Sequence, residues 1–397
     1  MSSFLTRVRG YIPALQVTLA GFIGFIPLMT LPLMIGVLVD YQHYSQKVAG
    51  TVSAAQLFGV SIGILLLSRY TLRYGLKNNV SCAALFVLVI EIVSLLFEAL
   101  PALYVFRFLS GLGGGVVAGC TYTWLGNSRD PDRGFGLFLL IQFLLGALLL
   151  YILPLGFSRF GAEVIKLPFL FFAVLAIVFS AAFKGTDERS DERISFREIL
   201  AAKGAVPALL AVGLFELAMS LVWAQVERLG STWQLSAAVI SQALALATLA
   251  GLLGALLVVL VGVKLGRALS IIIGISIIVA VLLALITYQS SLIIFIVSMV
   301  LFNIAWSFTV PYLQGVQASL GAGAGVVCLG AFVITVSLAL GPALSGFLVA
   351  SYGFLGAVIG AMILLVFCLY FVCSAIFSQK KIRSQGAKNS DVITAQK

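Results

Sequence analysis

"SRYTLRYGLKNN", residues 68–79, is a basic island in an otherwise apolar part of the chain. It carries Arg69, Arg73 and Lys77 but no acidic residue, and an apolar run of about twenty residues flanks it on each side. A membrane helix needs about 20 apolar residues, because the backbone must satisfy its own hydrogen bonds in lipid. The island is therefore predicted to be a short connection between two membrane helices.

The rest of the sequence follows the same pattern. Of the 397 residues, 61% are hydrophobic and only 10% are charged, whereas a soluble domain is about half apolar and a quarter charged. The sequence predicts an all-α membrane protein with twelve spans, roughly 12–39, 48–68, 79–98, 102–124, 134–156, 166–184, 203–226, 236–262, 268–288, 291–316, 323–349 and 354–377.

The basic residues indicate how the chain crosses the membrane. With the N terminus inside, the inner segments hold 19 of the 24 Lys and Arg residues, the outer loops hold 4, and Arg107 lies within a span. Basic residues concentrate in cytoplasmic loops. We therefore expect a multi-pass protein of the cell inner (plasma) membrane with both termini in the cytoplasm. The net charge of +10 then reflects topology, not nucleic-acid binding.

A polar segment, "KGTDERSDERISFREILAAKG" at 184–204, divides the spans into two sets of six. Ser195 followed by Glu198 is a capping-box pattern, which predicts a short amphipathic helix on the inner membrane surface. The expected domains are an N-terminal six-helix bundle, this cytoplasmic linker, a C-terminal six-helix bundle and a cytoplasmic tail, over residues 1–184, 185–202, 203–378 and 379–397.

Features of the basic island recur in the second half of the chain. "LRYGLK", residues 72–77, is echoed by "VKLGRA", residues 263–268, which places Gly75 and Gly266 191 residues apart. The same offset relates two serines, each just before the second span of its half: Ser45 and Ser236. An internal repeat of this size predicts two pseudo-symmetric bundles that meet at a site near the middle of the membrane.

These motifs resemble those of the major facilitator superfamily (MFS). Its loop after the second helix reads G-x-x-x-D-[RK]-x-G-[RK]-[RK], where this chain has Ser68 and Leu72 in place of the glycine and the aspartate. "RFLSGLGGG", residues 107–115, is similar to a second motif, R-x-x-x-G-x-G. The resemblance implies alternating access between the bundles, without the usual acidic latch. The residues expected to act in gating are Arg73, Gly75, Lys77, Lys264, Gly266, Arg267, Gly111 and Gly114.

Few ionisable residues lie well inside the predicted spans, and each is costly there. Glu216 is near the middle of the seventh span, and Glu216, Ser220, Trp223 and Glu227 recur at a spacing that places them on one stripe of a helix. Such a stripe suggests a cavity wall, with a buried carboxyl that can take up and release a proton. The alternative is a structural hydrogen bond to a neighbouring helix.

Arg107 and Glu91 lie at similar depths in the fourth and third spans, which predicts that they can pair. The pair can be static, or it can be exchanged when substrate or a proton arrives; we favour exchange. In the resembled family this arginine is often linked to proton coupling. The tenth span adds a mixed polar and aromatic lining that suits a small organic molecule, with Asn303 and Ser307 as its expected substrate-binding residues.

The sequence favours a transporter and not an enzyme. It has one histidine, and its five cysteines are scattered within spans, so we expect no metal site and no cofactor. We predict a monomeric secondary transporter that moves a small organic molecule, coupled to protons, with efflux favoured slightly. Proton-coupled import of a small organic anion attracted by Arg107 is the alternative. A membrane enzyme or a non-transporting sensor is more distant.

Overall fold

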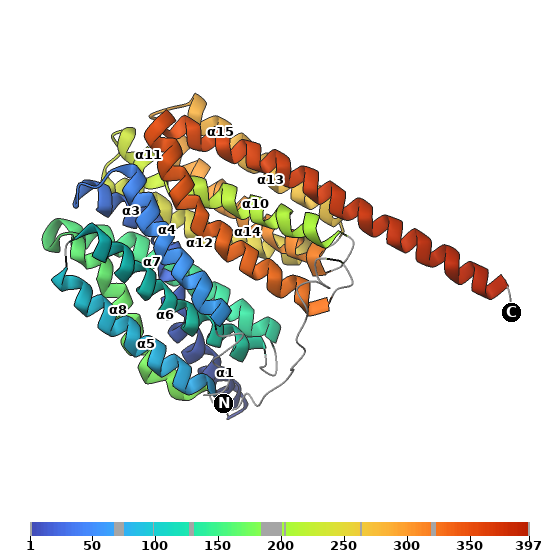
Figure 1. The fold of residues 1–397 in the computed structure, drawn as a ribbon, viewed down its shortest axis with the longest axis horizontal. Coiled ribbons are helices and arrows are strands. Elements are labelled where there is room, and N and C mark those ends of the chain that lie inside the picture. Colours follow the sequence, from blue (N-terminus) through green and yellow to red (C-terminus); the bar gives the residue numbers. More distant parts are fainter. Residues whose placement is uncertain are drawn as a thin grey trace.

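The computed structural model describes residues 2–66, 75–97, 99–126, 131–183, 201, 204–262, 264–318 and 323–395. Within these ranges the regular structure is entirely helical (Figure 1). The first half contains α1 Ser2–Gly21, η1 Phe22–Gly24, α2 Ile26–Met29, α3 Leu31–Asp40, α4 Gln46–Leu66, α5 Gly75–Val93, η4 Ser94–Leu96, α6 Leu100–Gly126, α7 Pro131–Phe160, η5 Ala162–Lys166, α8 Leu167–Phe179 and η6 Ser180–Phe183. The second half contains α10 Ala205–Trp223, α11 Val226–Thr232, α12 Ala237–Val261, α13 Arg267–Thr287, α14 Leu292–Ala318 and α15 Gly323–Ala395.

The helices are long and apolar enough to cross a membrane. Ten such spans occur in the described part of the chain, and two shorter apolar helices, Ile12–Gly24 and Leu31–Asp40, form the first segment. The tenth span, Leu329–Phe377, contains a kink at Gly353. The broken first segment adds one crossing to these ten, and the kinked helix counts as two crossings and not one. The total then agrees with the twelve predicted spans. The predicted linker helix lies outside the described residues.

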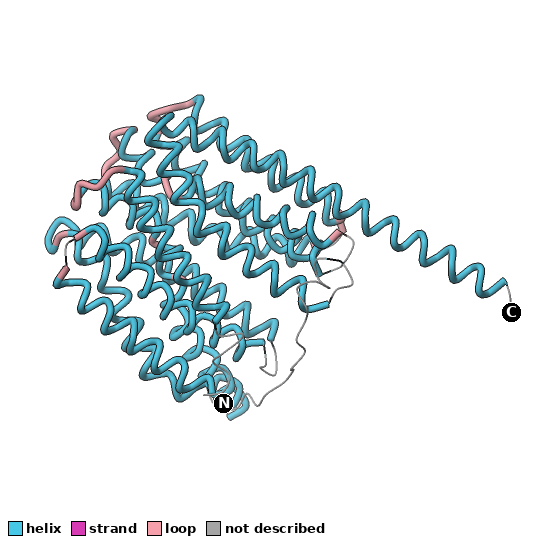
Figure 2. The backbone as a smooth tube through the Cα atoms, viewed as in Figure 1, coloured by secondary structure: helices cyan, strands magenta, loops and turns pink. Residues whose placement is uncertain are grey.

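The helices run side by side and define two ends of the molecule (Figure 2). One end, here the loop end, carries the connections 41–45, 233–236 and 288–291, which gather at the upper left of the figure. The opposite end, here the terminal end, carries the N terminus, and α15 continues beyond it to Ala395 (Figure 1). From the distribution of basic residues, we expect the loop end to lie outside the cell.

The backbone confirms the internal repeat. Ser45 Oγ accepts a hydrogen bond from Val48 N at 3.3 Å, and Ser236 Oγ accepts one from Val239 N at 3.4 Å, so both predicted serines cap the second long helix of their half. Gly75 and Gly266 both have positive φ, +74° and +76°. The two halves therefore repeat the same local conformations at the same offset.

Close helix contacts repeat in the same way. Gly63 of α4 lies against the backbone of α6 at Leu112, and Gly254 of α12 lies against the backbone of α14 at Ile304. A side chain at either glycine would collide with that backbone, so small residues set the helix spacing in both halves. Between the halves, α4 packs along α15 and α7 packs along α12.

The halves differ in where their first helix breaks. Proline lacks a backbone N–H and its ring clashes with the carbonyl four residues earlier. Pro27 and Pro32 lie in the first turns of α2 and α3, so each proline marks the start of a new short helix in the first segment. The equivalent segment of the second half has no proline there, and α10 continues unbroken to Trp223.

Candidate functional site

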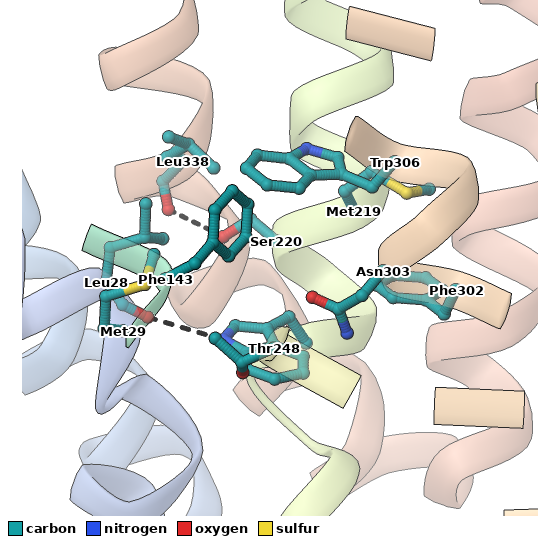
Figure 3. A pocket seen from close by; sticks show the side chains of 11 residues that line it. Leu28, Met29, Phe143, Met219, Ser220, Thr248, Phe302, Asn303, Trp306 and Leu338 are labelled. Carbon is teal, nitrogen blue, oxygen red and sulfur yellow. Dashed lines mark hydrogen bonds between the residues drawn. The ribbon is translucent and has the colours of Figure 1, made fainter. Parts of the chain in front are cut away.

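A cavity lies between the two halves, near the middle of the long helices (Figure 3). Its walls come from α2, α7, α10, α12, α14 and α15. The lining residues are Leu28, Met29, Phe143, Met219, Ser220, Trp223, Thr248, Phe302, Asn303, Trp306 and Leu338. The structure thus contains a cavity at the place where the sequence predicts that the two repeats meet.

Matching positions of the two repeats face each other across this cavity. Leu28 and Met29 of α2 correspond, at the 191-residue offset, to Met219 and Ser220 of α10. Trp223 Nε1 donates to Leu28 O at 3.4 Å and joins the two elements directly. The bend of the first segment exposes this carbonyl, because the helical bonding pattern is interrupted there.

The three polar side chains of the lining donate to backbone carbonyls. Ser220 Oγ donates to Leu338 O at 2.8 Å and Thr248 Oγ1 donates to Leu244 O at 2.8 Å. Asn303 Nδ2 donates to Met299 O at 3.2 Å. In Figure 3 the amide oxygen of Asn303 points toward the side of the cavity where Phe143 lies. These bonds hold the side chains in place and leave their oxygen lone pairs for other partners.

Glu216 lies one side chain away from the cavity. Its carboxylate oxygen Oε2 accepts a hydrogen bond from Trp306 Nε1 at 3.1 Å, and only 1% of the residue is exposed. The ring of Trp306 also meets Phe143 of the first half edge to face, with ring centroids 6.3 Å apart. Trp306 therefore connects the buried acid, the cavity and the opposite half of the molecule.

The predicted stripe on the seventh span needs one correction. Glu216, Ser220 and Trp223 lie on α10, but the helix is interrupted at Ala224 and Gln225, and Glu227 belongs to α11. No proline or glycine marks this break in the sequence. Glu227 accepts a hydrogen bond from Ser231 at 3.1 Å and does not line the cavity.

Glu91 and Arg107 form a separate buried pair between α5 and α6. Arg107 Nη1 lies 3.6 Å from Glu91 Oε1, which also accepts a hydrogen bond from Ser110 Oγ at 2.6 Å. Both side chains are almost fully buried, and Glu91 Oε2 has no hydrogen-bond partner. Neither residue lines the cavity. The structure thus brings these two predicted residues together but keeps them apart from Ser220, Trp223 and Asn303.

The other predicted site residues have mainly structural surroundings. Ser307 Oγ donates to Gly251 O at 2.7 Å and ties α14 to α12. Gly111 abuts the backbone of α4 at Gln56, and a side chain at Gly114 would lie 3.3 Å from Gly24 Cα.

Of the expected gating residues, Gly111 and Gly114 lie in the middle of α6, and the other described ones lie at the terminal end. Lys77 follows Gly75 at the start of α5 and is exposed, as is Lys264. Arg267 begins α13, directly after Gly266, and its side chain lies beside Gly315 of α14. Arg73, Ser68 and Leu72 lie outside the described residues.

Several residues of the site and of the contact between the halves are not predicted from the sequence. Phe143 and Thr248 line the cavity from α7 and α12, but nothing in their sequence surroundings distinguishes them from packing residues. Arg228 forms a salt bridge with Asp40 across the two halves at the loop end, 2.5 Å between Nη1 and Oδ1. The sequence signal for this pair is limited to opposite charges at the outer ends of the first and seventh predicted spans. Among the described residues no group of three His, Cys, Asp or Glu side chains could hold a metal ion.

Two repeated helical bundles around a shared central cavity define a membrane transport protein. The match to known proteins is specific: residues 17–327 match the model of the Major Facilitator Superfamily, and the chain belongs to that family of transporters. It is a transporter and not an enzyme.

Solved structures share this fold at low identity. A D-xylose-proton symporter is 16% identical with a TM-score of 0.71, over 90% of this chain and 96% of that one. The nucleoside transporter NupG is 14% identical with a TM-score of 0.69, over 93% and 99%. A bacterial homologue of the human lysosomal transporter Spinster, inward-facing and unoccupied, is 14% identical with a TM-score of 0.66, over 94% and 97%. The chain matches no curated protein sequence.

Proposed function

We propose that this chain is a proton-coupled secondary transporter that exports a small, largely apolar organic molecule by alternating access. The observation that carries the proposal is the central cavity, which both repeats line with apolar and aromatic side chains. Ligand sites are typically lined in this way, with a few polar groups that fix orientation. The protein would act as a monomer in the cell inner membrane, with both termini in the cytoplasm.

Glu216 is the proposed proton carrier. A buried carboxylate is costly unless it is paired or protonated, and the bond from Trp306 is a single neutral donor. Proton binding at Glu216 would therefore change the bond to a residue that lines the cavity. This connection is the physical basis for coupling proton movement to substrate movement.

The character of the cavity supports export over import. No charged residue lines it in the part of the chain that the structure describes, and Arg107 lies elsewhere. An organic anion would thus meet no basic partner in the cavity, which argues against the anion importer considered from the sequence. A lipophilic solute enters cells through the bilayer unaided, so a carrier for such a solute is useful mainly for extrusion.

Everted membrane vesicles test the proposal. The lumen is acidified by respiration and loaded with a pH-sensitive dye, and a panel of lipophilic compounds is added. Wild-type protein should release lumenal protons on addition of a substrate, whereas Glu216→Gln should reduce this release more than tenfold. Glu216→Gln should still exchange labelled for unlabelled substrate, since exchange needs no net proton movement.

Glu163→Gln is the matched control, because Glu163 is half-exposed at the loop end, outside the cavity, and should leave proton release unchanged. Accumulation of labelled substrate without proton release in the wild type would contradict proton coupling. Proton uptake into the lumen would contradict antiport.

A further inference from the structure

The hydrogen-bonding character of the cavity specifies its ligand more closely than its apolar walls do. Resting on the proposed function, we propose that the central cavity binds an aromatic organic cation of the protonated-amine type. Three features of the cavity favour such a ligand: the direction of its hydrogen bonds, its aromatic faces and the position of the nearest charge.

Nearly all hydrogen-bond donors in the lining are already used. The hydroxyls of Ser220 and Thr248 donate to backbone carbonyls, and the indole N–H groups of Trp223 and Trp306 donate to Leu28 O and Glu216 Oε2. One N–H of the Asn303 amide donates to Met299 O, which leaves one N–H of this amide as the remaining side-chain donor.

The acceptors, by contrast, remain available. Each hydroxyl keeps lone pairs, and the amide oxygen of Asn303 is directed into the cavity (Figure 3). A ligand that donates hydrogen bonds therefore finds several partners, while a ligand that only accepts them finds one. A carboxylate or phosphate would be desolvated without compensation, which is costly for a charged group.

Aromatic faces add an attraction for positive charge. Phe143, Trp223, Phe302 and Trp306 all line the cavity. A cation within about 6 Å of a ring centroid is attracted by the ring quadrupole, most strongly by tryptophan and more when it is desolvated. The flat part of an aromatic amine would also pack against these rings.

The nearest acid, Glu216, carries the negative charge that would attract a bound cation. Glu216 binds the indole N–H of Trp306, so an ionised carboxylate makes the ring face of Trp306 more negative on its cavity side. A cation in the cavity and a proton on Glu216 would then compete for the same negative charge. Such competition makes binding of one favour release of the other.

Three matched probes test the ligand class on the purified full-length protein in lipid nanodiscs. 2-Naphthylmethylamine, protonated at neutral pH, 2-naphthylmethanol and 2-naphthoate share one ring system and differ in charge. Quenching of protein tryptophan fluorescence reports binding. The ammonium should bind at least tenfold more tightly than the alcohol, and the carboxylate should bind most weakly.

Two substitutions test which residues cause the preference for a positively charged ligand. Glu216→Gln and Trp306→Phe should each bring the ammonium-to-alcohol affinity ratio close to one, with little change for the alcohol. Glu227→Gln is the matched control, since Glu227 is the other acid of the same span but lies outside the cavity, and it should preserve the ratio.

The possible results separate this inference from the proposed function. Equal binding of all three probes, tightest binding of the carboxylate, or no binding of the ammonium would overturn the cation assignment. Proton release from everted vesicles with a neutral substrate would still support proton-coupled export in each of those cases. If Glu216→Gln preserves the ammonium-to-alcohol affinity ratio, Glu216 is not the charge that attracts the cation, and that part of the proposal is wrong.

Discussion

The first segment of each half occupies the same place in the repeat but is built differently. Residues Leu28 and Met29 sit in a segment that Pro27 and Pro32 break into short helices, whereas Met219 and Ser220 sit in the unbroken α10. The proline-broken segment presents the backbone carbonyl of Leu28, which accepts a hydrogen bond from Trp223, while the continuous helix contributes the hydroxyl of Ser220. The two equivalent segments thus contribute different hydrogen-bonding groups to the site, a backbone carbonyl in one and a side-chain hydroxyl in the other.

This division extends to the rest of the cavity. Among the described residues, the first half contributes Leu28, Met29 and Phe143 to the lining, and all three are apolar. The three polar residues of the lining belong to the second half, which also holds Glu216. In the first half, Glu91 and Arg107 are buried as a pair away from the cavity. Substrate contacts and proton coupling are therefore expected to depend on the second half.

The largest expected effect is at the ion pair of the first half. Arg107→Ala leaves Glu91 buried without its cation, and breaking a buried pair on one side costs about 3–5 kcal/mol. The free energy of unfolding, measured by denaturant in micelles, should fall by that amount. The double variant Arg107→Ala/Glu91→Gln should recover most of it, because no buried charge is left unpaired.

Transport by the double variant distinguishes a structural ion pair from one that is exchanged during transport. If the pair is structural, proton-driven transport should return together with stability, and coupling belongs to Glu216 alone. Recovered stability without coupling would instead mean that the pair is exchanged during transport, as the sequence analysis favours. In that case the division of roles between the halves would be wrong.

The second expected effect is smaller and should be equal in the two halves. Gly75→Ala and Gly266→Ala place a side chain at positive φ, which costs about 1–2 kcal/mol. Neither position has an atom within 4 Å of the added Cβ, so no steric clash adds to this cost. Both variants should lower stability alike, as measured by thermal unfolding in the same detergent.

Gly136→Ala provides the control, since this helical glycine also has open space around its Cβ but no positive φ. It should be neutral or slightly stabilising, because alanine is the better helix former. Clearly unequal losses at Gly75 and Gly266 would mean that the two turns, although alike in conformation, differ in their importance for the fold.

Most of the fold could be predicted from the sequence, and less of the site. Apolar length and the repeated turn glycines identify the helices and their symmetry, because both follow from local physical requirements. The break after Trp223 could not be predicted, since it depends on tertiary contacts and has no proline or glycine. Gln225, at this break, donates to Ser345 Oγ of α15 at 3.0 Å.

The site was predictable where polarity stands out against an apolar background. Polar or amphipathic side chains in a membrane helix are costly to bury and therefore usually have a role. On this basis the sequence identifies four residues of the site: Glu216, Ser220, Trp223 and Asn303. Phe143 was not, because an aromatic residue in a span is usually a packing residue, and only the approach of α7 to α14 brings its ring to Trp306. The partner of Glu216 likewise depends on helix packing and not on spacing.

The smallest expected effect concerns the contact between the halves at the loop end. Asp40 and Arg228 are partly exposed, and such pairs contribute about 0.2–1 kcal/mol. Asp40→Asn should therefore raise the population with separated halves at this end by no more than about fivefold. The charge-reversed double variant Asp40→Arg/Arg228→Asp should restore the original balance.

Spin labels at the repeat-related positions His43 and Gln234 measure this population. Both residues are exposed at the loop end, one in each half, and both have positive φ, +57° and +59°. In a cysteine-free background, His43→Cys/Gln234→Cys should give a distance distribution in which Asp40→Asn increases the longer component. An unchanged distribution would mean that the tight packing of Gly50 against the Pro342 backbone, and not the ion pair, holds this end closed. The two halves would then be joined by the same kind of small-residue contact that spaces the helices within each of them.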